Sequence, residues 1–117
     1  MNKRNGLHLT LNPNIGRISI GQNALKALGM PESVLLLVSP EEAALFLTVN
    51  GEQDPRGMKV KQDSKGTMRV YSQALCKAIL SLLPGWDGQT AIRLMGTRTE
   101  QGIVFSLVSS AKGGIPT

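Results

Sequence analysis

Residues 9–30 read LTLNPNIGRISIGQNALKALGM, and this stretch decides the fold. Leu9 and Leu11 alternate with polar residues, residues 12–16 are rich in turn formers, and Ile18 and Ile20 then flank a serine. Alternation at every second position is typical of strands with one buried face, and an Asn-Pro-Asn cluster between two such runs is typical of a turn. The stretch therefore predicts two short strands joined by a turn.

A short helix and a hairpin follow. Residues 22–28 have helical spacing, with Ala24 and Leu25 on one face, and Gly29 is placed as a C-terminal stop. Residues 34–38 form a short apolar run that precedes a Ser-Pro-Glu-Glu turn, and residues 45–49 alternate as a returning strand. The first half of the chain is thus predicted as β-β-α-β-β.

The same order recurs in the second half. Setting Gly16 over Gly66 aligns the turns, the second strands and the starts of the two helices without a gap. The second unit is predicted to contain strands near 58–61, 68–70, 91–95 and 103–108. Its helix is capped by Ser72, carries an apolar stripe, and stops at residues 84–85.

The predicted fold class is mainly β with short helices (α+β), built from two β-β-α-β-β repeats, residues 7–49 and 58–108, with a linker over 50–57. Units of about 45 residues are too small to bury a core alone, so we expect the two to interlock in one domain spanning residues 1–108. The tail, residues 109–117, has no periodicity and is expected to be disordered.

Composition excludes most enzyme classes. The 117 residues include one cysteine, Cys76, and one histidine, His8, so an intramolecular disulfide and a multi-cysteine zinc site are excluded and a catalytic triad is disfavoured. We predict no enzyme activity, no cofactor and no metal. The longest apolar run, residues 34–38, is far too short to span a bilayer, and the first residues lack a signal-peptide pattern. The sequence therefore predicts a cytoplasmic protein without a membrane partner.

The charge is basic and uneven. Lys and Arg number 13 against 8 for Asp and Glu, a formal charge of +5, of which residues 1–50 contribute +1 and residues 51–117 contribute +4. Such a balance favours a polyanion partner, although it also serves solubility.

The first unit resembles the AbrB-like swapped-hairpin family of DNA-binding proteins. Family members read strand, Asp-x-x-Gly-Arg-[Val/Ile]-x-[Ile/Leu]-Pro, a short helix ending in Leu-Gly, then a hairpin. The matching positions here are Gly16, Arg17, Ile18, Ile20, Leu28, Gly29 and the hairpin over 34–49. The chain departs from the pattern at Pro13, Gly21 and Leu25.

The resemblance implies a swapped-hairpin barrel of two interlocked units, with tandem members of the MraZ type as precedent for two units in one chain. It implies double-stranded DNA as the partner, and a transcriptional regulator or an antitoxin-like component as the function. A homodimer or a protein partner such as a toxin stays open. The expected DNA-binding residues are the cations of the first hairpins and helices: Lys3, Arg4, Arg17, Lys26, Lys59, Lys61, Lys65, Arg69 and Lys77.

The alternative is an interaction or oligomerisation module that does not bind nucleic acid, in which the cations are solvated surface. Other conspicuous residues favour structural roles. Cys76 is expected to be inert, Trp86 to pack, and Glu41 and Glu42 to lie at a hairpin tip as ordinary ionised carboxylates.

Overall fold

A computed structural model of the chain describes residues 7–51, 54–83 and 90–107. Along them follow β1 (His8–Asn12), β2 (Arg17–Ile20), α1 (Gln22–Ala27), β3 (Ser33–Ser39), β4 (Ala44–Val49), β5 (Met58–Lys59), β6 (Met68–Tyr71), α2 (Gln73–Leu80), β7 (Ile92–Arg98) and β8 (Ile103–Ser106). The prediction of a mainly β fold with two short helices is confirmed. The N-terminal residues 1–6 and the tail expected to be disordered, residues 109–117, lie outside the described residues.

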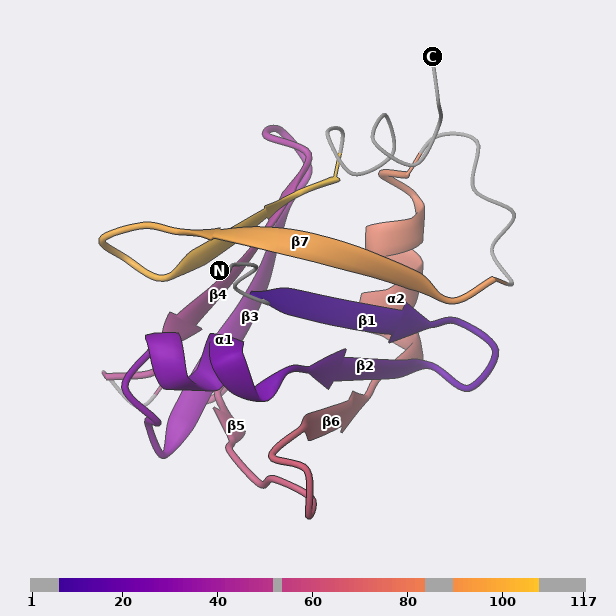
Figure 1. The fold of residues 1–117 in the computed structure, drawn as a ribbon. Helices are drawn as coiled ribbons and strands as arrows, with labels where there is room; N and C mark the ends of the chain where they lie inside the picture. The colour runs from indigo at the N-terminus through magenta and orange to yellow at the C-terminus, as the bar shows by residue number, and fades with distance from the viewer. Residues whose placement is uncertain (1–6, 52–53, 84–89, 108–117) are drawn as a thin grey trace, which may run out of the picture.

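The strands form one antiparallel, eight-stranded sheet in the order β5-β3-β4-β8-β7-β1-β2-β6. The sheet curls into a half-barrel (Figure 1). Its two ends approach each other at an isolated bridge between Gln62 and Met68. The inner face is apolar because the residues that point inward, every second one along a strand, are apolar. In β2, for example, Ile18 and Ile20 are fully buried, whereas Arg17 and Ser19 are half-buried.

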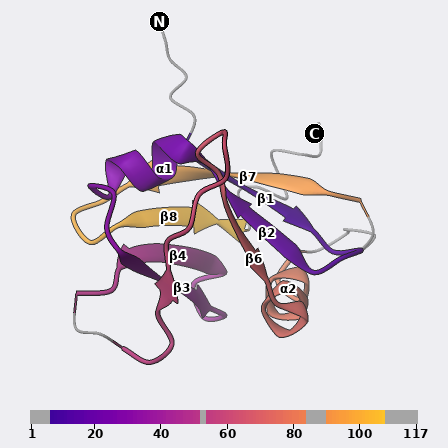
Figure 2. The ribbon, with the colours of Figure 1, turned by 90° about the horizontal axis from the view of Figure 1, so that it is seen from below.

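The two helices lie on opposite sides of the molecule in Figure 2. Leu25 of α1 and Ile79 of α2 are fully buried and join the same core cluster as the inward-facing strand residues. Ser72 caps α2, since its hydroxyl oxygen accepts a hydrogen bond from the backbone N–H of Leu75 at 3.2 Å. The predicted cap of α2 is therefore confirmed.

Strands of the first half pair with strands of the second half. β1 pairs with β2 and also with β7, and β3 pairs with β4 and also with β5. The pairs β2–β6 and β4–β8 join the strands that hold the same place in the two halves. In β2–β6, Ser19 lies opposite Arg69, the residue that corresponds to it when Gly16 is set over Gly66. Neither half therefore forms its sheet without the other.

The turns before β2 and β6 contact the opposite helix. Gly16 and Gly66 both have positive φ, 64° and 83°. A Cβ added at Gly16 would lie 2.8 Å from the side chain of Gln73 in α2, and one at Gly66 would lie 2.7 Å from that of Gln22 in α1. Glycine thus serves two purposes at each turn, a left-handed backbone and room for the other half's helix.

Three boundaries differ from the prediction. The strand predicted near 58–61 is reduced to Met58–Lys59. Val60 N–H still bonds to the carbonyl of Glu32, one step further along the β3–β5 register, but β3 itself begins at Ser33. The helix predicted to reach residues 84–85 ends at Leu80, and a tighter turn over residues 81–83 follows it. The third strand of the second half, predicted at 91–95, extends to Arg98 as β7.

Candidate nucleic-acid interface

The outer side of the sheet has two regions of different chemistry. Over β7, β1, β2 and β6 the outward residues are polar or basic apart from the exposed Met95 and Tyr71, and these four strands contain no acidic residue. We call this region the arginine face and define it by Arg17, Arg69, Arg93 and Tyr71. Over β3, β4 and β8 the outward row is instead apolar.

One cross-strand row forms the middle of the arginine face. Arg93 lies opposite Thr10, Thr10 opposite Ser19, and Ser19 opposite Arg69. Paired residues project from the same side of a sheet, and the neighbouring positions, Leu9 and Leu94, are buried, so this row faces outward. Strands lie about 4.8 Å apart, which puts the backbone positions of the two exposed arginines about 14 Å from each other.

A second row adds Arg17 and Tyr71. Asn12 lies opposite Arg17, and Arg17 lies opposite Tyr71 across the β2–β6 pair. Tyr71 is 65% exposed, the most exposed large apolar side chain of the described residues. The Nε of Arg17 is buried without a hydrogen-bond partner, while the side chain as a whole is half-buried. The row therefore places a guanidinium beside an exposed aromatic ring.

Arg69 is held by a carboxylate. Its Nη1 lies 2.9 Å from Oδ2 of Asp63. Oδ1 of Asp63 accepts the backbone N–H groups of Lys65 at 2.8 Å and Thr67 at 3.0 Å. These bonds from Thr67 and Lys65, followed by the charge of Arg69, lower the pKa of Asp63 below its usual value. The ionised Asp63 thus shapes the turn before β6 and neutralises part of the arginine face.

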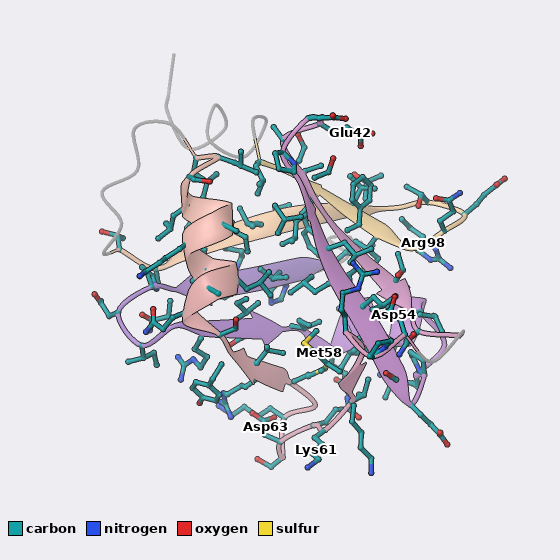
Figure 3. All side chains as sticks on the ribbon, turned by 180° about the vertical axis from the view of Figure 1, so that it is seen from behind. Glu42, Asp54, Met58, Lys61, Asp63 and Arg98 are labelled. Atoms are coloured by element: carbon teal, nitrogen blue, oxygen red, sulfur yellow. The ribbon has the colours of Figure 1, made fainter. Side chains whose placement is uncertain are left out.

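The predicted lysines are spread over several surfaces. Lys61 lies close to Asp63 in the connection from β5 to β6, far from Glu42 at the tip of the β3–β4 turn (Figure 3). Lys59 is exposed on β5 beside a hollow that Glu32 also lines. Lys26 and Lys77 are exposed on α1 and α2, which lie on opposite sides of the molecule (Figure 2), so the structure does not bring these two together.

Two of the predicted cations, Lys3 and Arg4, lie outside the described residues. Sequence analysis missed Arg93 and Tyr71. Arg93 alternates with buried Leu94 in an apolar stretch, and that alternation was the available signal for an outward cation. No sequence signal placed it beside Thr10, because the β1–β7 pairing joins segments more than 80 residues apart.

The apolar region of the outer side centres on Phe46. Phe46 lies opposite Leu37 on one side and Val104 on the other. These three half-buried side chains line a hollow of about 570 Å³ together with the turn after β7, which includes Glu100. No helix among the described elements covers this side, since both helices contribute their apolar residues to the inner core.

The remaining conspicuous residues have ordinary surroundings. Cys76 is buried, and burial raises the pKa of its thiol, which disfavours the reactive thiolate. His8 lies outward on β1 opposite Met95, and Glu41 and Glu42 are exposed at the β3–β4 turn as predicted. Trp86 lies outside the described residues. Within the described ranges, no three His, Cys, Asp or Glu side chains gather as a metal site.

Neither described helix has the length and apolar character needed to cross a membrane. Comparisons with protein-family models, curated proteins and solved structures find no significant match.

Proposed function

We propose that the chain binds double-stranded DNA through the arginine face, and that its two β-β-α-β-β units interlock in the swapped-hairpin manner of the AbrB-like family. On this proposal it acts as a transcriptional regulator or an antitoxin-like component. The swapped-hairpin arrangement is supported by the pairing of β1 with β7 of the second half and of β5 with β3 of the first half.

The observation that carries the DNA-binding proposal is the cross-strand row from Arg93 to Arg69, with Arg17 in the next row. Three arginines project from four strands that carry no carboxylate. Phosphate contacts dominate DNA affinity, and arginine suits them because its guanidinium binds oxygen pairs with two parallel hydrogen bonds. The spacing of about 14 Å is comparable to the width of the major groove of B-DNA, about 12 Å, which admits a β-ribbon.

Tyr71 supplements the charge. Tyr71 is exposed beside Arg17, and burying its aromatic ring against a sugar or an unstacked base is more favourable than leaving it exposed to water.

The test is the salt dependence of binding to a fluorescein-labelled duplex of mixed sequence, measured by anisotropy between 50 and 200 mM salt. If Arg17 and Arg93 each contact one phosphate while Asp63 holds Arg69, the slope of log K against log salt is about −1.8 for the parent chain, since each contact contributes about −0.9. Replacing Arg93 with Gln reduces the slope by about 0.9.

The matched control is Lys77→Gln, which removes the same charge from α2, a helix whose buried residues pack on the inner face of the sheet. Its slope equals that of the parent if binding uses the arginine face. Equal losses in the two variants would show that net charge alone attracts DNA, and absence of binding at 50 mM salt would reject the proposal.

The second candidate function is a protein-interaction module, and the apolar outer row around Phe46 favours it. In that case the chain shows no salt-dependent duplex binding, and Phe46→Ser rather than Arg93→Gln changes its association state.

A further inference from the structure

An apolar groove opens where the curled sheet fails to close. It has a volume of about 660 Å³ and lies between β3 and β5 on one side and β6 and α2 on the other. We call it the strand groove, and its apolar lining includes Leu36, Val38, Met58, Val70, Leu75 and Ala78. This groove is distinct from the arginine face, because Val70 points into it while its neighbours Arg69 and Tyr71 project from the opposite side of β6.

The first half of the chain closes the corresponding place. There β1 continues along both neighbours: Gly21 N–H donates to the carbonyl of His8 at 3.2 Å, and Gly96 N–H donates to that of Leu7 at 2.7 Å. Arg98 Nε also donates to the carbonyl of Ala27 at 3.1 Å, which ties β7 to α1. These bonds hold β1 against both of its neighbouring strands.

In the second half the chain turns away before it reaches this position. Asp54 shapes the turn, since its Oδ1 accepts the backbone N–H of Arg56 at 2.8 Å and its carbonyl accepts that of Gly57 at 2.8 Å. Asn50 fixes the start of the turn through hydrogen bonds to Asp54 and to Ser33. The short β5 therefore begins at Met58 and leaves the rest of the β3 edge uncovered.

That edge carries backbone groups that face the groove. β5 pairs with β3 only at Ser33 and Val34. Ser33 accepts a backbone bond from Asn50, at the end of β4, and residues of an antiparallel strand bond to their two neighbours alternately. Leu36 and Val38 therefore direct their backbone N–H and carbonyl groups toward the groove, where the described residues provide no strand partner.

The charge of the lining is one-sided. Among the described residues that line the groove, Arg56 is the only charged one. The Arg56 side chain is 70% exposed although it also pairs with Asp54 at 2.8 Å. A partner carboxylate at this end of the groove would share the exposed Arg56 guanidinium with Asp54.

We infer that the strand groove captures an extended, acidic peptide segment of another protein, which adds to the free edge of β3 at Leu36 and Val38. One apolar side chain of the peptide lies between Leu75 and Ala78, and an Asp or Glu of the peptide contacts Arg56. When a peptide adds as a strand to a sheet edge, its main-chain hydrogen bonds supply affinity, and every second side chain of the peptide supplies selectivity. The inference goes beyond DNA binding and uses none of the residues of the arginine face.

The test begins with a random decapeptide display library selected on the full chain, followed by fluorescence polarisation of the enriched peptides. Enriched sequences are expected to alternate apolar with polar residues and to contain Asp or Glu. Enrichment of basic peptides, or no enrichment above an unrelated protein, overturns the inference.

A pair of variants then locates the site. Ala78→Glu adds a charge at an exposed helix position that lines the groove, so it leaves folding intact and weakens peptide binding at least about tenfold. Gln73→Glu adds the same charge to the same helix, at a side chain that packs against Gly16 instead, and is expected to bind as the parent does. Equal effects of the two variants overturn the assignment.

Two further measurements separate strand addition from other modes. N-methylation of alternate backbone positions of the best peptide abolishes binding in the one register that faces β3, whereas tolerance in both registers excludes strand addition. Arg56→Gln weakens acidic peptides and leaves neutral ones unchanged. If Ala78→Glu instead converts a dimeric chain to a monomer in the absence of peptide, the occupant is a second copy and the inference of a foreign peptide is wrong.

Discussion

The substitution Asp63→Asn tests the role of Arg69 in the arginine face most directly. The amide oxygen of Asn retains an acceptor for the backbone N–H groups of Lys65 and Thr67, which now bond to Oδ1 of Asp63. The amide nitrogen that replaces Oδ2 cannot accept from Arg69, so the 2.9 Å ion pair is lost. The substitution therefore frees one guanidinium with little change in the turn.

The expected gain follows from the number of phosphate contacts. If Arg69 contacts DNA only after it leaves Asp63, its release adds up to one full contact and steepens the salt slope by about 0.9. Over a fourfold change in salt, this extra slope changes the ratio of affinities by a factor of about 3.5, because 4 raised to the power 0.9 is about 3.5.

The chain provides a matched control in Asp54→Asn. It removes the same single charge and likewise frees an arginine, Arg56, which pairs with Asp54 at 2.8 Å in the loop before β5. Arg56 lies at the strand groove and not on the arginine face. Both variants and the parent are compared by anisotropy with one labelled duplex at four salt concentrations.

The two variants separate local contact from net charge. We expect the steeper slope only in Asp63→Asn. Equal steepening in both variants would refute a specific role for Arg69 and leave only general attraction between a basic protein and DNA. An unchanged slope in both would remove Arg69 from the interface, whatever the affinity of the parent.

Three other predictions concern stability. Because β1 and β5 each pair with a strand of the other half, residues 1–52 and 53–117 expressed separately should show no cooperative thermal unfolding as monomers, by circular dichroism. Gly29→Ala, at a φ of 84° with open space around it, should lower the free energy of unfolding by about 1 kcal/mol. Gly102→Ala should lower it distinctly more, because the new Cβ would overlap a backbone carbonyl. Chemical denaturation measures both, and equal losses would contradict the packing of the turn at Gly102. The hydrogen bond from Arg56 lowers the pKa of Asp54 from 3.8 to about 2, so carboxyl NMR should show Asp54 titrating near pH 2. The stability that Asp54 contributes above pH 3.8 should disappear as the pH falls through about 2. A midpoint near 3.8 would contradict that bond.

Most of the helices and strands could be predicted from local sequence patterns. The alternation of Ile18 and Ile20, the helix face with Leu25, and the capping serine Ser72 each have a short-range physical cause, and each appears where expected. The shortened β5 could not be predicted this way. Met58 and Val60 alternate like a strand, and Val60 N–H bonds to Glu32 in the β3–β5 register, but the length of β5 depends on where its distant partner β3 begins.

The candidate interface was harder to predict because it depends on register. Arg17 and Arg69 were expected from their places beside the second strands, and the structure sets them on adjacent rows of the same face. Arg93 joins them only through β1, which sits between β7 and β2. The pairing of Arg69 with Asp63 was missed for a similar reason, since it depends on the turn that Asp63 itself folds.

The asymmetry between the halves links the arginine face to the strand groove. Both halves have the same order of elements, and a fully closed ring would require β5 to pair along β6 as β1 pairs along β2. Instead, Asp54 and Asp63 each fold a turn and each hold an arginine, one on either side of β5. Asp54 folds the turn at which β5 begins, and Asp63 folds the turn before β6 and restrains Arg69 on the face proposed for DNA, so a turn-forming carboxylate that holds an arginine occurs at both surfaces. Loss of the two ion pairs together should therefore alter both surfaces, whereas loss of either one should alter only the surface that its arginine lines.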